Sequence, residues 1–155
     1  MLEPAPSSAA PHAARRRWLS VLAHASSAEI EARLAGAPAL PAHACLRGPE
    51  TGLVMLLGRA GGGGAAFNLG EMSVTRCSVR NGAGNIGHAT VAGRDRRQAE
   101  LVAALDAAMQ DPALAPALEA AVIAPLAAAR EAKTEAVARK AAATRVQFFA
   151  MGKMR

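Results

Sequence analysis

The 155-residue chain has no tyrosine, one tryptophan and three phenylalanines. Large aromatic side chains supply much of the burial energy of an ordinary core. This chain must instead pack small residues, which makes it a candidate for completion by a partner protein. The same shortage argues against binding of single-stranded nucleic acid, because such proteins stack bases on aromatic rings. The formal net charge of +6 still allows an anionic partner.

Cysteine and metal-ligand patterns are equally sparse. The two cysteines, Cys45 and Cys77, form no CxxC pair, and we expect two buried, reduced thiols, although a disulfide stays open on parity alone. None of the four histidines has metal-ligand spacing to a cysteine or carboxylate, so we expect no metal site.

The chain also lacks an apolar stretch long enough to cross a membrane. Arg15–Arg17 followed by Trp18–Ala23 imitates an export signal, but the apolar run has six residues, against about 7–15 in a signal peptide. Helical spacing of its apolar residues favours an amphipathic helix instead. We therefore expect a cytoplasmic protein without a membrane segment.

The length predicts one domain. We expect a disordered tail over residues 1–12, a single domain over residues 13–151 and a flexible end over residues 152–155. The first helices should cover Ala13–His24 and Ala28–Leu34. Ser26 lies three residues before Glu29, the spacing of a capping box at the start of the second helix.

Strands should follow the two helices. We expect a short strand at Ala44–Arg47, ended by Gly48-Pro49, and a second at Gly52–Gly58, whose apolar run predicts burial on both faces. Glu71–Arg80 and Ile86–Ala92 flank a turn and predict an antiparallel hairpin. The mixed faces of Glu71–Arg80 suggest that one side is a contact surface.

Helices should complete the chain. Asp95 should cap a helix that runs to Gln110 and buries a stripe at four-residue spacing: Leu101, Leu105 and Met109. We expect a short helix at Pro116–Ile123 and an alanine-rich helix at Leu126–Ala143, with Glu135 and Arg139 paired. The predicted fold is α+β, a small, mainly antiparallel sheet with N-terminal helices and a C-terminal alanine-rich helical segment.

Two segments could bind an anion. Arg59 is followed by a glycine loop that includes Gly61, Gly62 and Gly64, whose N–H groups could cradle a phosphate. The loop matches neither a Walker A nor a Rossmann motif, so a flexible connection is the alternative. Arg94, Arg96 and Arg97 surround Asp95 at a helix start, where they could bind a carboxylate or phosphate or form a solvated turn.

His88 lies in the middle of a predicted strand. It could act as a general base if Glu71 reached it across the hairpin. A structural, hydrogen-bonded histidine is the alternative that we favour.

Four segments in order carry a family resemblance: RRRWLSVLAHAS at Arg15–Ser26, PETGLVMLLGRAGG at Pro49–Gly62, FNLGEMSVTRCSVRNGAGNIGHATVAGRDRRQAE at Phe67–Glu100, and TRVQFFAM at Thr144–Met151. They resemble the G subunit of the bacterial carbon–phosphorus lyase core complex, the PhnG family of phosphonate metabolism. The family usually has a small hydroxyl residue where this chain has Gly63.

The resemblance implies a role in replacing the adenine of ATP by methylphosphonate, which gives alpha-D-ribose 1-methylphosphonate 5-triphosphate. It implies a scaffold interleaved with the I subunit, completed by the H and J subunits in two copies each. ATP would be a substrate of the complex, and an iron–sulfur cluster would lie on another subunit, so no cofactor is expected in this chain. We expect no catalytic residue here, and we expect interface anchors at Trp18, Phe148 and Phe149.

Two alternatives remain at this stage. The chain could be a stand-alone nucleotide- or phosphate-binding module that uses the Gly61–Gly64 loop and the Arg94–Arg97 cluster. A basic adaptor for nucleic acid would instead show steeply salt-dependent binding.

Overall fold

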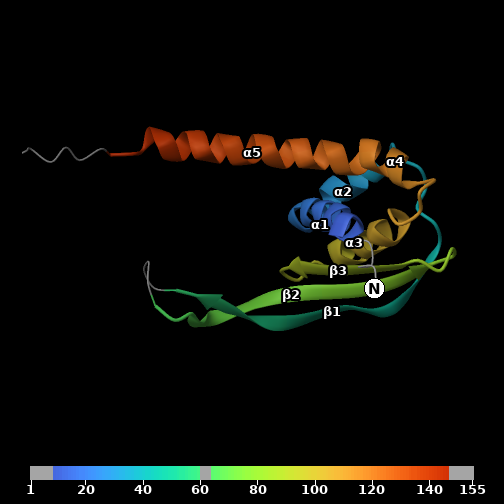
Figure 1. Cartoon of the computed structure of the whole chain (residues 1–155), viewed down its shortest axis with the longest axis horizontal. Helices are drawn as coiled ribbons and strands as arrows, with labels where there is room; N and C mark the ends of the chain where they lie inside the picture. Colours follow the sequence, from blue (N-terminus) through green and yellow to red (C-terminus); the bar gives the residue numbers. More distant parts are fainter. Residues whose placement is uncertain (1–8, 60–63, 147–155) are drawn as a thin grey trace, which may run out of the picture.

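The computed structural model describes residues 9–59 and 64–146. It confirms the α+β class, with helices on one side of a three-stranded antiparallel sheet of order β1-β2-β3 (Figure 1). The strands are β1 (His43–Gly58), β2 (Phe67–Asn81) and β3 (Ile86–Ala92). Helix α3 (Arg96–Ala108) packs directly on β2 and β3, and the predicted hairpin at Ile86–Ala92 is confirmed.

The N-terminal helices are α1 (Ala9–His24) and α2 (Ser27–Leu34). Helix α1 begins four residues before the predicted start at Ala13, and residues 1–8 of the predicted tail lie outside the described residues. The capping box is confirmed, because the Ser26 hydroxyl accepts from the Glu29 N–H and the Glu29 carboxylate accepts from the Ser26 N–H. This cap fixes the turn between the two helices.

The sequence predicted two strands, at Ala44–Arg47 and Gly52–Gly58. This prediction is wrong, because both segments belong to one strand, β1. The strand continues through Gly48-Pro49 because two register shifts take up the extra residues as a bulge. Gly48 has a φ of +72° and lies against the Arg76 carbonyl, a position that only glycine can occupy without strain.

The core lies between the sheet and α1–α3. Helix α3 is buried on nearly all sides, and the predicted stripe is confirmed, with Leu101, Leu105 and Met109 all buried. Gly87 allows this packing, since a Cβ at Gly87 would overlap the Ala103 carbonyl of α3. The small residues of α3 therefore permit a close approach that replaces aromatic anchors.

The last helical segment runs without interruption through α4 (Ala115–Leu118), the π-helical turn η1 (Glu119–Ile123) and α5 (Ala124–Ala143). The sequence predicted two helices separated at Pro125. The Ala124 N–H donates to the Glu119 carbonyl five residues earlier, and this wider turn accommodates the proline ring inside the helix. The C-terminal half of α5 extends past the body of the molecule (Figure 1), and its predicted Glu135–Arg139 pair is present at 3.8 Å.

None of the helices in the described ranges combines the length and the apolar character needed to cross a membrane.

Candidate functional site

The predicted anion-binding segments do not form one site in the part of the chain that the structure describes. Arg59 is exposed at the end of β1, while Gly61 and Gly62 lie outside the described residues. At the start of α3, Asp95 accepts hydrogen bonds from the Gln98 N–H at 2.9 Å and the Ser27 hydroxyl at 2.7 Å. Both bonds lower the pKa of the Asp95 carboxyl, as expected for a helix cap.

The arginines around Asp95 point to different surroundings. Arg97 pairs with Glu31 at 2.7 Å and with Glu100 at 3.6 Å, and its hydrogen bond to Glu31 raises the pKa of the guanidinium. Arg94 is exposed and belongs to none of the ion pairs among the described residues. The cluster is thus partly neutralised by its own chain, which weakens the case for a phosphate site there.

Trp18 is half-buried and packs on the core of its own chain. Its indole N–H donates to the Asp106 carboxylate at 3.0 Å. Phe148 and Phe149, the other predicted interface anchors, lie outside the described residues. The role of Trp18 as an anchor for a partner stays a prediction, and its part in holding α1 against α3 is evident.

Asp106 is the centre of a polar network that the sequence did not reveal. Its side chain is fully buried and accepts from Arg15 Nε at 3.0 Å, Arg15 Nη2 at 2.6 Å and the His88 backbone N–H at 2.9 Å, besides Trp18. The hydrogen bonds between Arg15 and Asp106 raise the pKa of the Arg15 guanidinium. The sequence contained one indication of this network: an aspartate on a helix face otherwise filled with alanine and leucine. A carboxylate buried on such a face requires hydrogen-bond partners.

The same network covers one edge of the sheet. The Ile86 carbonyl on β3 accepts from Gln110 at 2.8 Å and from Arg15 at 3.4 Å, and the His88 N–H is bonded to Asp106. Exposed strand edges invite pairing with other chains. In the described residues, the β3 edge is therefore occupied by side chains of α1 and α3, whereas no strand or helix pairs with the outer edge of β1.

His88 is a hydrogen-bonded histidine, as favoured from the sequence. Its Nδ1 lies 2.9 Å from the Ser78 hydroxyl. Glu71 is too distant along the hairpin to serve as its partner, since Glu71 pairs with Met55 of β1 and His88 lies opposite Ser78. The general-base interpretation with Glu71 is therefore wrong.

The thiols also differ from the expectation. Cys77 is buried, but Cys45 is exposed, so only one of the two predicted buried thiols is confirmed. Burial, reinforced by the neighbouring Cys45 thiol, raises the pKa of Cys77 to about 11. Neither cysteine is in a disulfide, and the described residues contain no cluster of three potential metal ligands.

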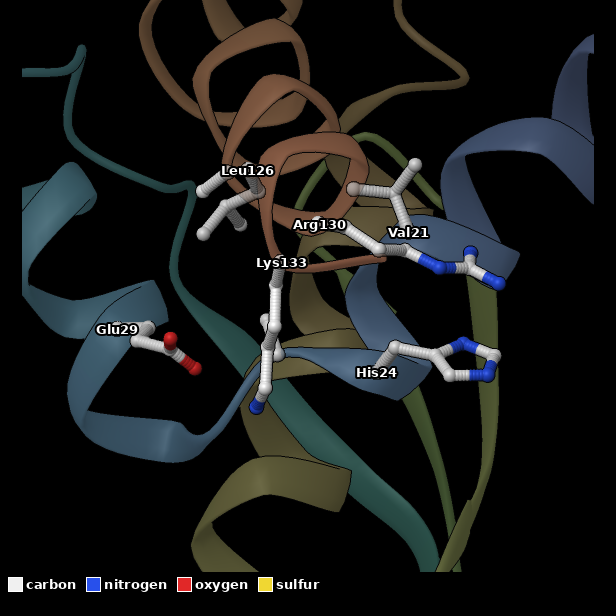
Figure 2. A pocket seen from close by; sticks show the side chains of 8 residues that line it. Val21, His24, Glu29, Leu126, Arg130 and Lys133 are labelled. Carbon is white, nitrogen blue, oxygen red and sulfur yellow. The ribbon is translucent and has the colours of Figure 1, made fainter. Parts of the chain in front are cut away.

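The pockets of the described surface are small or open. Figure 2 shows one of those between α1 and α5, where Val21 and Leu126 contribute apolar walls and Glu29 and Lys133 face each other. Its volume of about 60 Å³ is enough for only a few water molecules. A drug-sized ligand needs a cleft of roughly 300 Å³ or more, so this cavity cannot be a nucleotide site.

A two-stranded extension is the most unusual surface. Strand β3 pairs only with Val74–Arg80 of β2, so residues 53–58 of β1 and 67–73 of β2 form a ribbon without a third strand, which we call the distal hairpin. The apolar run at Gly52–Gly58 was predicted to be buried on both faces and is instead exposed. Six large side chains of the distal hairpin are 40–71% exposed: Leu53, Met55, Leu56, Leu57, Phe67 and Leu69.

Alternation along the strand places these side chains on both faces of the ribbon. Soluble monomers rarely expose contiguous apolar surface of this kind unless it binds something. This surface defines the class of the protein: a small α+β domain that exposes an apolar ribbon suited to assembly with other chains.

The comparisons identify the family. The family model described as phosphonate metabolism protein PhnG matches residues 13–153. A relative from Rhizobium meliloti (strain 1021), alpha-D-ribose 1-methylphosphonate 5-triphosphate synthase subunit PhnG, is 42% identical over 139 residues, which cover 90% of this chain and 88% of the relative. The chain belongs to the PhnG family, so the resemblance seen in the sequence is confirmed.

Proposed function

We propose that this chain is a subunit of the carbon–phosphorus lyase core complex in phosphonate catabolism. In that role it supports formation of alpha-D-ribose 1-methylphosphonate 5-triphosphate from ATP and methylphosphonate. It acts mainly as a structural partner of the I subunit, in an assembly that also holds the H and J subunits in two copies each. The activity belongs to the assembly, and this chain alone is non-catalytic.

The observation that carries the proposal is the distal hairpin. Burying a leucine, methionine or phenylalanine side chain contributes about 1.5–3 kcal/mol, and six such side chains are 40–71% exposed here. A hairpin without a third strand is also marginal by itself. A partner that covers both faces of the ribbon would supply the missing burial.

The projecting part of α5 supports the same role. In Figure 1 the distal hairpin and the C-terminal half of α5 extend from the same side of the body. Val137 on this helix is 61% exposed, and the alanines around it allow another chain to approach closely. Two projecting arms suit an interleaved assembly better than a contact between flat surfaces.

The other parts of the proposal follow from the family. ATP is a substrate of the assembly, this chain carries no cofactor, and an iron–sulfur cluster belongs to another subunit. The assembly works in the cytoplasm, without a membrane or nucleic acid as partner.

Co-expression tests the proposal. The tagged chain is expressed with the I, H and J subunits of the same organism, and the captured material is separated by size exclusion. We expect one large species that contains all four chains. A tagged chain that elutes alone, with the other subunits well expressed, would refute the proposal.

Variants localise the contact. Met55→Lys and Leu57→Lys place charges on exposed positions of the distal hairpin, 63% and 71% exposed in the isolated chain, and should reduce recovery of the I subunit at least tenfold. Leu46→Lys is the matched control, because Leu46 is 48% exposed on the same strand but outside the distal hairpin. Equal recovery with all three variants would exclude the distal hairpin as the interface.

A further inference from the structure

The sheet face that points away from α3 is polar and basic. Side chains alternate between the two faces of a strand. On β2 and β3, Cys77, Val79, Ala89 and Val91 are buried toward the helices, and the intervening Arg76, Arg80 and His88 are exposed. All labelled helices lie on the opposite side of the sheet in Figure 1.

Strand register arranges this face into rows. The central row contains Ser78 of β2 and His88 of β3, directly opposite each other. Arg76 and Arg80 lie two residues before and after Ser78 on the same strand, which is about 7 Å in each direction. Two guanidinium groups therefore flank the Ser78–His88 pair on one surface.

His88 is held by one contact of its ring and one of its backbone. Its Nδ1 is 2.9 Å from the Ser78 hydroxyl, and its backbone N–H is bonded to the buried Asp106 carboxylate at 2.9 Å. When the Ser78 hydroxyl donates to Nδ1, the ring hydrogen is on Nε2, which can donate to a ligand. Ser78 thus positions a third donor between the two arginines.

The charges of Arg76 and Arg80 are not compensated within the described ranges, where neither side chain has an ion pair. Five other arginines do pair with carboxylates: Arg15, Arg17, Arg47, Arg97 and Arg139. Glu50 lies opposite Arg76, but its carboxylate binds Arg47 at 2.6 Å. The surface therefore offers two planar guanidinium forks, each able to bind phosphate in a bidentate way.

We propose that Arg76, Arg80 and His88 bind the oxyanions of a phosphate-bearing ligand, with Ser78 as a positioning residue. The two arginines originate about 14 Å apart along β2, and their long side chains can reach over the central row from opposite ends. A chain of phosphates presents several oxyanions in a line and can reach both forks, whereas one carboxylate reaches one. That the ligand carries a triphosphate is an inference that rests on the proposed function. The site itself rests on the pairing register of β2 and β3.

The test uses inorganic tripolyphosphate as the probe and the full-length chain, by calorimetric titration at low and high salt. Arg76→Gln and Arg80→Gln should each weaken binding about 3- to 10-fold, since the contacts are charge-assisted but exposed. Arg94→Gln removes the same charge from an exposed arginine elsewhere and should change affinity less than twofold. Absent binding, or an equal loss with Arg94→Gln, would overturn the site.

Ser78 needs a separate readout. Ser78→Ala should weaken binding about threefold by releasing the His88 ring, and Ser78→Thr, which keeps the hydroxyl, should restore it. Loss in both variants would refute the positioning role. The nitrogen resonances of His88 should show hydrogen on Nε2 in the wild-type chain and a mixture in Ser78→Ala.

Two further probes identify the ligand class. Orthophosphate should bind more weakly than tripolyphosphate, and polyglutamate at equal charge should not displace it; displacement would show a surface for acidic protein instead. Arg76→Gln and Arg80→Gln should leave co-elution with the I, H and J subunits unchanged. If either variant no longer co-elutes, the two arginines bind a subunit and not a phosphate, and the site is overturned. Failure of the wild-type chain to co-elute refutes the proposed function alone.

Discussion

Replacing Asp106 by asparagine should destabilise the chain far more than its small change in size suggests. One carboxylate oxygen accepts from Arg15 Nη2 and the His88 N–H, and the other accepts from Arg15 Nε and Trp18 Nε1. In either orientation, the amide NH2 of asparagine meets two donors that have lost their acceptor. The variant therefore creates a buried clash of donors in place of a satisfied network.

The magnitude follows from the burial of those donors. A buried polar group without a partner costs about 1–3 kcal/mol. The Arg15 side chain is 33% exposed and can partly recover hydration, whereas Asp106 is not exposed at all. We therefore expect a loss of about 2–4 kcal/mol in the free energy of unfolding, which lowers the Tm of a chain of this size by roughly 5–15 °C.

Urea unfolding followed by tryptophan fluorescence measures this loss directly. Trp18 is the only tryptophan and is bonded to Asp106, so the probe reports on the altered site. Glu119→Gln is the control, because it removes a carboxylate from the exposed ion pair with Arg17, which should contribute less than about 1 kcal/mol. If Asp106→Asn and Glu119→Gln proved equally stable, the reasoning from buried donors would be wrong.

Three other changes have defined outcomes. Gly87→Ala places a methyl group into the Ala103 carbonyl of α3 and should destabilise by about 2–4 kcal/mol, measured by urea unfolding. In a thiol assay at pH 8, Cys45 should react quickly and Cys77 only on unfolding; because burial raises the pKa of Cys77 to about 11, its contribution to stability should be complete below the ordinary thiol pKa and decline as the pH rises toward 11. Asp95→Ala should lower the free energy of unfolding by about 1 kcal/mol, because it removes a helix cap. Since the pKa of Asp95 is lowered in the fold, this difference should shrink as the pH falls below the ordinary pKa of an aspartate and through the lowered one. Equal labelling of both thiols, or a pH-independent effect of Asp95→Ala, would contradict these assignments.

Local patterns predicted the elements that depend on near neighbours. The Ser26–Glu29 capping box, the Asp95 cap and the turn between β2 and β3 are all present, because each is decided by residues a few positions apart. The stripe on α3 was equally visible, since apolar spacing is a local property.

Features that depend on distant residues were missed. Asp106 meets Arg15 from 91 positions away, and no periodicity connects them. Pro125 was expected to break a helix, and a π turn accommodates it instead. The arginines at 94–97 were considered as one cluster, but Glu31 on α2 binds Arg97, a pairing that only the fold creates.

The prediction for Gly52–Gly58 failed in a way that bears on function. A continuous apolar run indicates burial on both faces of a strand, yet the described chain provides no third strand and no helix to cover it. The opposite edge of the sheet, at β3, is occupied by Asp106, Arg15 and Gln110 of the same chain. One edge is thus completed within the chain, while the apolar edge is left open. Under the proposed function, the burial that the sequence predicts for β1 is supplied by a second chain, and the distal hairpin is the surface that this proposal assigns to it.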